Sequence, residues 1–521
     1  MTLTILLSRK SIGPTCMNPP FDTGEPPSIV RPVVFIGLDG AEPDLLRRWM
    51  DDGTLPVLAR LRRDGICESV ATFPGFGDGA TWPSLVTGVN PARHGRYFRS
   101  QFRPRSYRRK NFSVDTDLER TPFWTSLSEA GRRVAVLDLP YARWEAGLNG
   151  LLLVDWLIHD RYGSPRSWPR EFAREVLERF GDDPVGGNSD GFPKDGASLQ
   201  RLLELLQQRV KMKASLLIET LATEPWDLVA TAFAEPHDLG HVAWHLHDSG
   251  HPQHDADWLR QHGDPIKALY VEIDGAIGRI LDAAPPKAAV VVFAGLGMGP
   301  NYTANEVLGE ILARLDGREY RPAYRLTKRL KAAGFPELIT RICGKVDTAR
   351  EILTLSGGRF FGMSHNDNSG AIRINLAGRE PAGRVSPAAY DAVCDELTEA
   401  FMEIKNSATG TPIVERVVRV GRELEGEHLD TMPDLLVVWS RESPFCAIES
   451  PRIGTINDVR SWGRTGDHTA GALLMVHGEG IRARHLQRKP SIVDIAATIG
   501  ALQGVALPNI DGRPIDGLCR A

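Results

Sequence analysis

Residues 33–95 read VVFIGLDGAEPDLLRRWMDDGTLPVLARLRRDGICESVATFPGFGDGATWPSLVTGVNPARHG, and the rest of the chain can be interpreted around them. The run Val33 to Leu38 is apolar and rich in β-branched residues, which predicts a buried strand of a parallel sheet. This strand delivers Asp39 to its carboxyl end, where open α/β sheets keep their chemistry.

Thr81 follows a glycine-rich loop and precedes an apolar segment. We therefore expect it at or near a helix N-terminus, with Pro83 in the first turn. A hydroxyl there faces free backbone N–H groups and the positive end of the helix dipole, which favours an anion such as phosphate or sulfate.

Composition limits the classes of protein and of partner. The 521 residues are 42% hydrophobic and 25% charged, enough for one large α/β domain with insertions or for two domains. A net charge of -4 gives no bulk attraction to nucleic acid or to an anionic membrane, so neither is an expected partner. The basic, aromatic-containing stretch from Arg96 to Lys110 leaves three interpretations open: a solvated loop, a rim for an anionic substrate, or a nucleic-acid contact.

The cysteines and the hydropathy indicate a cytoplasmic protein. The six cysteines are scattered and form no C-x-x-C pair, which fits free thiols in a reducing compartment. The apolar patch Leu3 to Leu7 is too short for a secretion signal, and no apolar run of about twenty residues could span a membrane.

Strands and helices are predicted to alternate after the opening stretch. Strands are predicted at 133–140, 151–156, 227–233 and 289–293, and helices at 122–130, 198–220 and 265–281. This order is typical of βαβ units. His159 and Asp160 follow the second of these strands and could approach Asp39 from a neighbouring strand.

A histidine-rich segment, EPHDLGHVAWHLH, follows the predicted strand 227–233 directly. His237, His241 and His245 are spaced at i, i+4 and i+8, so on a helix they share a face, and the first two can bind one metal ion. Asp238 is an alternative ligand if the register differs by one residue.

GLDGA, followed by TWPSLVTGVNPARHG, resembles the alkaline phosphatase superfamily, in the branch of type I phosphodiesterases and nucleotide pyrophosphatases. The resemblance implies Asp39 as a metal ligand and Thr81 as the covalent nucleophile. His237 and His241 match an Asp-x-x-x-His pair of ligands, with His237 at the Asp position. His468, in Gly466-Asp-His468, is similar to the family's late histidine and would complete the first metal site.

The chain departs from the family pattern at two places. Where the family has Ser-Asp-His-Gly-Met, with an Asp and a His for the second metal, this chain has Ala294-Gly-Leu-Gly-Met298. Only Asp39 and Thr81 then remain for a second ion, so we expect one ion, Zn²⁺ from its imidazole ligands, and leave a second divalent ion open. Ser84 stands where the family has a phosphate-binding Asn, and is the predicted substrate contact.

The resemblance implies an alkaline-phosphatase-like α/β core, with a mostly parallel central sheet, helices on both faces and an inserted cap. We predict a disordered lead-in at 1–28, a first part of the core at 29–302, the cap at 303–430 and the end of the core at 431–521, where the strand Asp434–Trp439 would return the chain to the sheet.

The predicted function is metal-dependent hydrolysis of a small phosphate ester, a diester before a monoester. Two alternatives stay open: a group transferase or other single-metal enzyme of the superfamily, and a non-catalytic binding relative. Thr81 argues against a sulfatase, because sulfatases of this superfamily use a modified Cys or Ser. The sequence leaves the oligomeric state and the exact substrate open.

Overall fold

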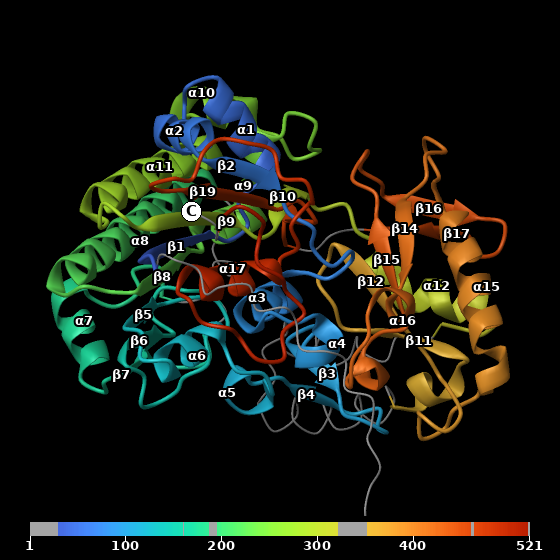
Figure 1. The fold of residues 1–521 in the computed structure, drawn as a ribbon. Coiled ribbons are helices and arrows are strands. Elements are labelled where there is room, and N and C mark those ends of the chain that lie inside the picture. Colours follow the sequence, from blue (N-terminus) through green and yellow to red (C-terminus); the bar gives the residue numbers. More distant parts are fainter. Residues whose placement is uncertain (1–29, 160, 187–194, 321–351, 460–462, 519–521) are drawn as a thin grey trace, which may run out of the picture.

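The structure is a computed structural model that describes residues 30–159, 161–186, 195–320, 352–459 and 463–518. The predicted lead-in at 1–28 lies outside these residues. The largest sheet has the strand order β2-β19-β9-β1-β8-β5-β6-β7 (Figure 1). Its strands are β1 (Val33–Leu38), β2 (Ile66–Ser69), β5 (Val134–Leu137), β6 (Gly150–Val154), β7 (Arg166–Trp168), β8 (Leu228–Phe233), β9 (Ala289–Ala294) and β19 (Leu473–His477).

The five central strands of this sheet are parallel, and β1 lies between β8 and β9 with every residue of its run paired on both sides. Alternate side chains of β1 enter two different cores: Val34, Ile36 and Leu38 on one face, Val33 and Phe35 on the other. The predicted fold class, a mostly parallel α/β sheet with helices on both faces, is therefore confirmed.

Helices cover both faces of the large sheet (Figure 1). One face packs against α1 (Pro43–Asp51), α2 (Pro56–Asp64), α7 (Phe172–Phe180), α8 (Gly196–Thr223), α9 (Glu235–His247), α10 (Ala256–His262) and α11 (Pro265–Ala283). The other face packs against α3 (Asp78–Thr87), α5 (Val114–Asp117), α6 (Phe123–Glu129) and α17 (Asp494–Leu502). No helix among the described residues has both the length and the apolar character needed to cross a membrane.

A second unit has its own core and two antiparallel sheets, with strand orders β11-β12-β15-β14 and β13-β16-β17. These strands are β11 (Phe360–Met363), β12 (Ser369–Ile374), β13 (Lys405–Asn406), β14 (Val414–Arg419), β15 (Leu435–Trp439), β16 (Ala447–Ser450) and β17 (Gly454–Asn457), and the helices packed with them are α12 (Leu308–Leu315) and α15 (Tyr390–Met402).

The expectation that the strand at Asp434–Trp439 returns the chain to the core is wrong. This strand is β15, and it pairs with β12 and β14 in the second unit. An apolar run shows that a strand is buried but not in which sheet it pairs, because both sheets offer apolar neighbours. The chain re-enters the large sheet only at β19, which pairs antiparallel with β9.

Shorter elements complete the described chain: β3 (Ser100–Phe102) paired with β4 (Arg109–Asn111), β10 (Gly297–Pro300) paired with β18 (Gly466–Thr469), α4 (Pro91–His94), α16 (Val420–Glu423), and three 3₁₀ turns at Asn305–Val307, Pro387–Ala389 and Leu429–Thr431. The basic stretch from Arg96 to Lys110 thus ends in a hairpin, and its first residue, Arg96, is buried rather than part of a rim.

Helix α3 begins earlier than predicted. It starts at Asp78, so Pro83 lies inside the helix and the expectation of Pro83 in the first turn is wrong. Proline has no N–H to donate to the carbonyl of Gly79. Arg96 Nε donates to that oxygen instead, at 2.8 Å, and this compensation allows a proline so deep in the helix.

Candidate active site

The parallel strands deliver polar side chains to one edge of the large sheet, as the topology of such sheets leads us to expect. Asp39 follows β1, Asp138 follows β5, His159 follows β6 and Glu235 follows β8. All four are buried. The neighbouring strand β9 is instead followed by Gly295 and Leu296, which offer no metal-ligating atom.

Helix α9 presents His237 and His241 on one face, because residues four apart lie one turn from each other on a helix. Its first turn follows β8 without an intervening loop, which places both histidines at the carboxyl end of that strand. The start of the helix lies against the turn after β1. Gly40 has φ +69°, and a Cβ there would lie 2.6 Å from the Cα of His237. Glycine at this position therefore allows the chain after Asp39 to approach the first metal-ligand candidate closely.

The third histidine comes from a segment far along the chain. His468 lies on β18, opposite Met298 of β10. The Gly297–Met298 segment, which directly follows Gly295 and Leu296, thus supports His468 through backbone pairing.

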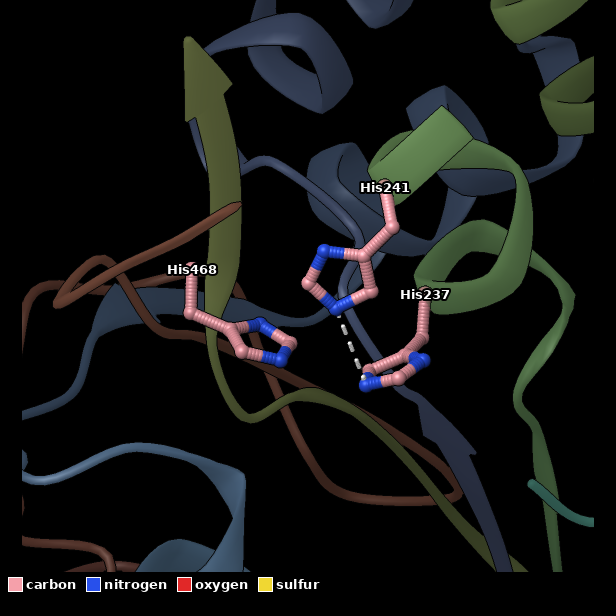
Figure 2. Close-up of side chains that lie close together, drawn as sticks. All are labelled: His237, His241 and His468. Carbon is pink, nitrogen blue, oxygen red and sulfur yellow. Dashed lines mark hydrogen bonds between the residues drawn. The ribbon is translucent and has the colours of Figure 1, made fainter. Parts of the chain in front are cut away.

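The three predicted histidine ligands lie together, as Figure 2 shows. Their nitrogens lie within 4.8 Å of one another. The ring centroid of His237 is 4.5 Å from that of His241 and 4.8 Å from that of His468. The Nε2 atoms of His237 and His241 are 3.3 Å apart.

The protonation of these rings suits metal binding. His241 Nδ1 lies 2.8 Å from the carbonyl oxygen of Gly466, which can only accept, so Nδ1 carries the proton and Nε2 offers its lone pair to the cluster. Burial and then the neighbouring His159 lower the pKa of His237 well below its usual value, and burial and then Arg464 do so for His241. Both rings are neutral at neutral pH, which is the form that binds a metal.

A second group of possible ligands adjoins the first and shares His237. Asp78, His159 and His237 bring their ligand atoms within 4.8 Å of one another. His159 Nε2 also lies 2.9 Å from Asp39 Oδ2, and the other oxygen of Asp39 accepts a hydrogen bond from Trp82 Nε1 at 2.9 Å. The predicted ligand Asp39 therefore lies beside the second group, and His159 does approach it from a neighbouring strand.

Asp78 is a site residue that the sequence interpretation missed. One oxygen accepts a hydrogen bond from Tyr141 Oη at 2.6 Å, and the other accepts one from Asn366 Nδ2, in the second unit, at 2.7 Å. Burial alone would raise the pKa of Asp78, but His468, His159 and these two hydrogen bonds lower it below its usual value. The signal that could have found it is an acidic residue directly after the glycine-rich loop, where a helix begins.

Thr81 and Ser84 lie deeper in α3. The Thr81 hydroxyl donates to the Gly77 carbonyl at 3.0 Å, and Ser84 Oγ hydrogen-bonds His94 Nε2 at 2.9 Å. Both side chains are buried, and no hydrogen bond among the described residues joins either of them to the histidine cluster. Their predicted roles stay predictions.

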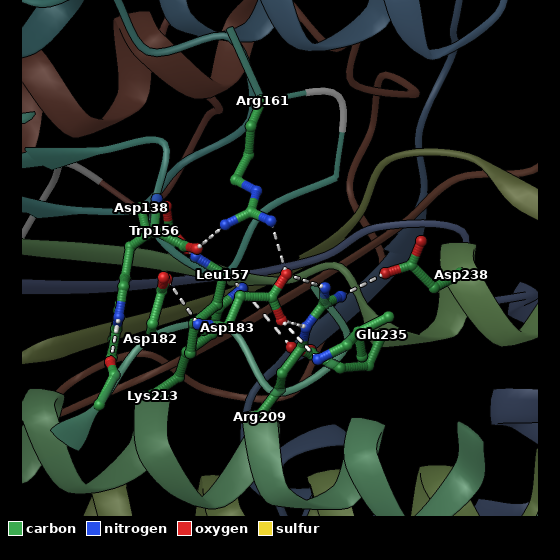
Figure 3. Close-up of polar contacts among 12 residues, drawn as sticks. Asp138, Trp156, Leu157, Arg161, Asp182, Asp183, Arg209, Lys213, Glu235 and Asp238 are labelled. Atoms are coloured by element: carbon green, nitrogen blue, oxygen red, sulfur yellow. Dashed lines mark hydrogen bonds and ion pairs between the residues drawn. The ribbon is translucent and has the colours of Figure 1, made fainter. Parts of the chain in front are cut away.

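The alternative ligand Asp238 is engaged elsewhere. It accepts a hydrogen bond from Arg209 Nη1 at 2.6 Å, within the polar network drawn in Figure 3. The register with His237 and His241 on the cluster face is therefore the one that the structure adopts.

The donor set fits a bound cation. Within the described chain, His237 Nδ1, both ring nitrogens of His468 and both carboxylate oxygens of Asp467 are buried without a hydrogen-bond partner. Leaving so many polar atoms unsatisfied costs free energy unless something else binds them. Three imidazoles with adjacent carboxylates are the ligands that Zn²⁺ prefers.

One solved structure shares the fold over nearly its whole length. The structure of human ectonucleotide pyrophosphatase/phosphodiesterase 5 is 13% identical with a TM-score of 0.50, and the match covers 92% of this chain and 97% of that one. Phosphonoacetate hydrolase from Sinorhizobium meliloti 1021, solved with phosphonoformate, is 15% identical with a TM-score of 0.48, and that match covers 92% and 96%. No curated protein sequence matches the chain. The family model of type I phosphodiesterases and nucleotide pyrophosphatases matches residues 33–463, and the chain belongs to that family.

Proposed function

We propose that this protein is a metal-dependent hydrolase of small phosphate esters, acting on diesters before monoesters. The observation that carries the proposal is the convergence of His237, His241 and His468, whose nitrogens lie within 4.8 Å of one another at the carboxyl edge of the sheet. Membership of a family of phosphodiesterases and pyrophosphatases supports phosphoester hydrolysis as the reaction class.

His237, His241 and His468 would hold one zinc ion. A bound zinc ion supplies Lewis acidity toward a phosphoryl oxygen and lowers the pKa of a bound water. Asp78, His159 and His237 form the adjoining group that a second divalent ion would use, and Asp39 lies beside it. Arg464 Nη1 lies 3.3 Å from His241 Nε2, so a guanidinium suited to phosphate oxygens is already at the cluster.

The residues at the start of α3 would meet the phosphoryl group. The backbone N–H groups there and the helix dipole favour an anion. Thr81 is the proposed nucleophile: after it gives up its hydrogen bond to Gly77, its hydroxyl oxygen would bond to phosphorus as the bond from phosphorus to the ester oxygen breaks, and the hydroxyl proton would pass to the leaving oxygen. Water would then cleave the phosphothreonine and restore the threonine. Ser84 is the proposed substrate contact. Asp78, already fixed by Tyr141 and Asn366, would orient the cation that faces this helix.

The test measures zinc content and the hydrolysis of bis(p-nitrophenyl) phosphate in the same preparations. His241→Ala should lose the tightly held zinc and at least 100-fold in kcat/KM, the scale expected when a catalytic metal is lost. His247→Ala is the matched control, because His247 lies on the same helix but pairs with Asp264. A parent that holds no metal, or a His241→Ala variant as active as the parent, would overturn the proposal.

The same assay examines the start of α3. If Thr81 is the nucleophile, Thr81→Ala abolishes turnover while zinc content stays at the parent level, whereas Asp78→Asn lowers both. If Thr81→Ala keeps its activity and Asp78→Asn loses it, Thr81 is not the nucleophile, and the reactive residue lies at the start of the helix.

A transferase of the same superfamily is the second candidate, because Gly295 and Leu296 replace the expected second-site ligands. It would release p-nitrophenol only when an acceptor alcohol is supplied.

We also propose a cytoplasmic location, since Cys67, Cys394 and Cys446 are all free thiols.

A further inference from the structure

Helix α8 carries two cationic side chains, Arg209 and Lys213, one turn apart and both almost completely buried. Buried lysine and arginine side chains are rare in proteins unless they are paired. Figure 3 shows that the two lie between the segment after β6 and the start of α9. Those segments carry His159 and His237, which are two of the possible metal ligands.

Arg209 connects α8 to α9 through a fixed hydrogen-bonding geometry. Its Nε and Nη2 atoms each donate to one oxygen of Asp183, both at 2.6 Å. Its Nη1 atom donates to Asp238 Oδ2, also at 2.6 Å. Since the guanidinium is planar and its donors form a rigid fork, this arrangement fixes Asp238, and with it the adjacent His237, relative to α8.

Lys213 connects the same helix to both sides of the site. Its Nζ donates to the carbonyl oxygen of Ala232 in β8 at 2.9 Å and lies 3.6 Å from Glu235, the first residue of α9. The same Nζ lies 3.5 Å from Asp138.

Asp138 in turn holds the segment that leads to His159. Its two carboxylate oxygens accept the backbone N–H groups of Trp156 and Leu157, at 2.9 and 2.8 Å. Arg161 donates to the carbonyl oxygen of Trp156 at 3.0 Å and to Asp183 at 2.8 Å, which closes the network. The positions of His159 and His237 are therefore linked through side chains of α8.

Such a network is a poor way to gain stability, because burying charges costs desolvation energy that their attraction only partly repays. Its effect is geometric. Resting on the proposed metal-binding function, we propose that Arg209 and Lys213 are positioning residues that hold α9 and the segment before His159 at the separation that the metal ligands require.

The first test removes the connection to α9 without leaving an uncompensated charge. Arg209→Met/Asp238→Asn deletes one cation and one anion, and Asp183 keeps its partner Arg161. We expect a variant that still folds, a dissociation constant for Zn²⁺ raised about 10- to 100-fold, as for the loss of residues that orient metal ligands, and faster amide hydrogen exchange in residues 235–247.

The matched control is Arg201→Met/Glu204→Gln, which removes an exposed ion pair from the same helix and should change neither readout. The companion variant Lys213→Gln/Glu235→Gln should speed exchange in residues 150–159. If Arg209→Met/Asp238→Asn folds and binds Zn²⁺ within about twofold of the parent, the positioning role is overturned.

Two further outcomes are decided by other measurements. If the double variant does not fold, Arg209→Lys replaces it, since it keeps the charge but loses the fork; an unchanged dissociation constant would then reject the proposal. If the parent binds no Zn²⁺, the proposed function fails, and the positioning role is judged by exchange alone: unchanged exchange of α9 in a folded variant rejects it.

Discussion

His94 shows how a single buried residue makes the fold sensitive to acid. Its Nδ1 accepts the backbone N–H of Arg96 at 3.1 Å, so Nε2 carries the proton and donates to Ser84 Oγ. Burial, and then Arg96, lower the pKa of His94 to about 3. The ring is therefore neutral throughout the range in which an unfolded histidine becomes charged.

The expected result is a loss of stability in acid. The unfolded chain binds a proton at His94 below about pH 6.5 and the folded chain does not until about pH 3, so each pH unit between them costs about 1.4 kcal/mol of unfolding free energy. His94→Asn should show a correspondingly shallower pH dependence in urea unfolding between about pH 6 and 4. His485→Asn, at a histidine whose side chain is 98% exposed, should match the parent. Equal slopes in all three proteins would contradict the prediction.

At the scale of an element, helix α3 depends on a residue outside it. Pro83 removes a helical hydrogen bond, and Arg96 supplies its replacement while its guanidinium lies 4.4 Å from the ring centroid of Tyr141. The helix that carries Asp78 into the site is thus completed by a tertiary contact.

A double-mutant cycle tests this compensation. Arg96→Met should destabilise the protein by about 2–4 kcal/mol, because it leaves the Gly79 carbonyl buried and unsatisfied and removes a packed side chain. In a Pro83→Ala background the restored N–H can bond that carbonyl, so the same change should cost about 1 kcal/mol less. Urea unfolding of the four proteins measures the coupling, and additive costs would show that Arg96 acts independently of Pro83.

At the scale of the whole molecule, the site joins segments that are distant in the sequence. His237 and His241 follow β8, His468 lies on β18 after the entire second unit, and Asn366 of that unit reaches Asp78. A metal ion bound by these histidines would connect the first half of the chain to its last strands.

Zinc should therefore stabilise the whole fold. At a free concentration 100-fold above its dissociation constant, a ligand that binds only the folded state adds about 2.7 kcal/mol to the unfolding free energy. We expect zinc to raise the melting temperature of the chelator-treated parent, and a chelator to reverse the rise. His241→Ala should not respond. A melting temperature independent of zinc in the parent would rule out a folded-state zinc site.

Local patterns were sufficient for the central strand and for the shared helix face of two of the candidate histidines. The strand of Val33 to Leu38 lies where its apolar run indicated, and His237 and His241 share a helix face because the i, i+4 spacing leaves no other arrangement on a helix. His159 was suggested by its place after a strand, whereas Asp78 was missed because the glycines around it concealed the first turn of α3.

The sequence by itself determined the α/β class and the shared helix face of His237 and His241, since periodicity and residue spacing are local properties that the backbone converts directly into a strand or a helix face. The family and the choice of His468 came from the resemblance of its motifs to the alkaline phosphatase superfamily. Only the tertiary structure decided that β15 pairs in the second unit, that Arg96 completes α3, and that Asp78 and His159 meet beside Asp39. Those features depend on which distant segments pack together, and that choice is made by the summed burial and pairing of the whole chain rather than by any one stretch of it.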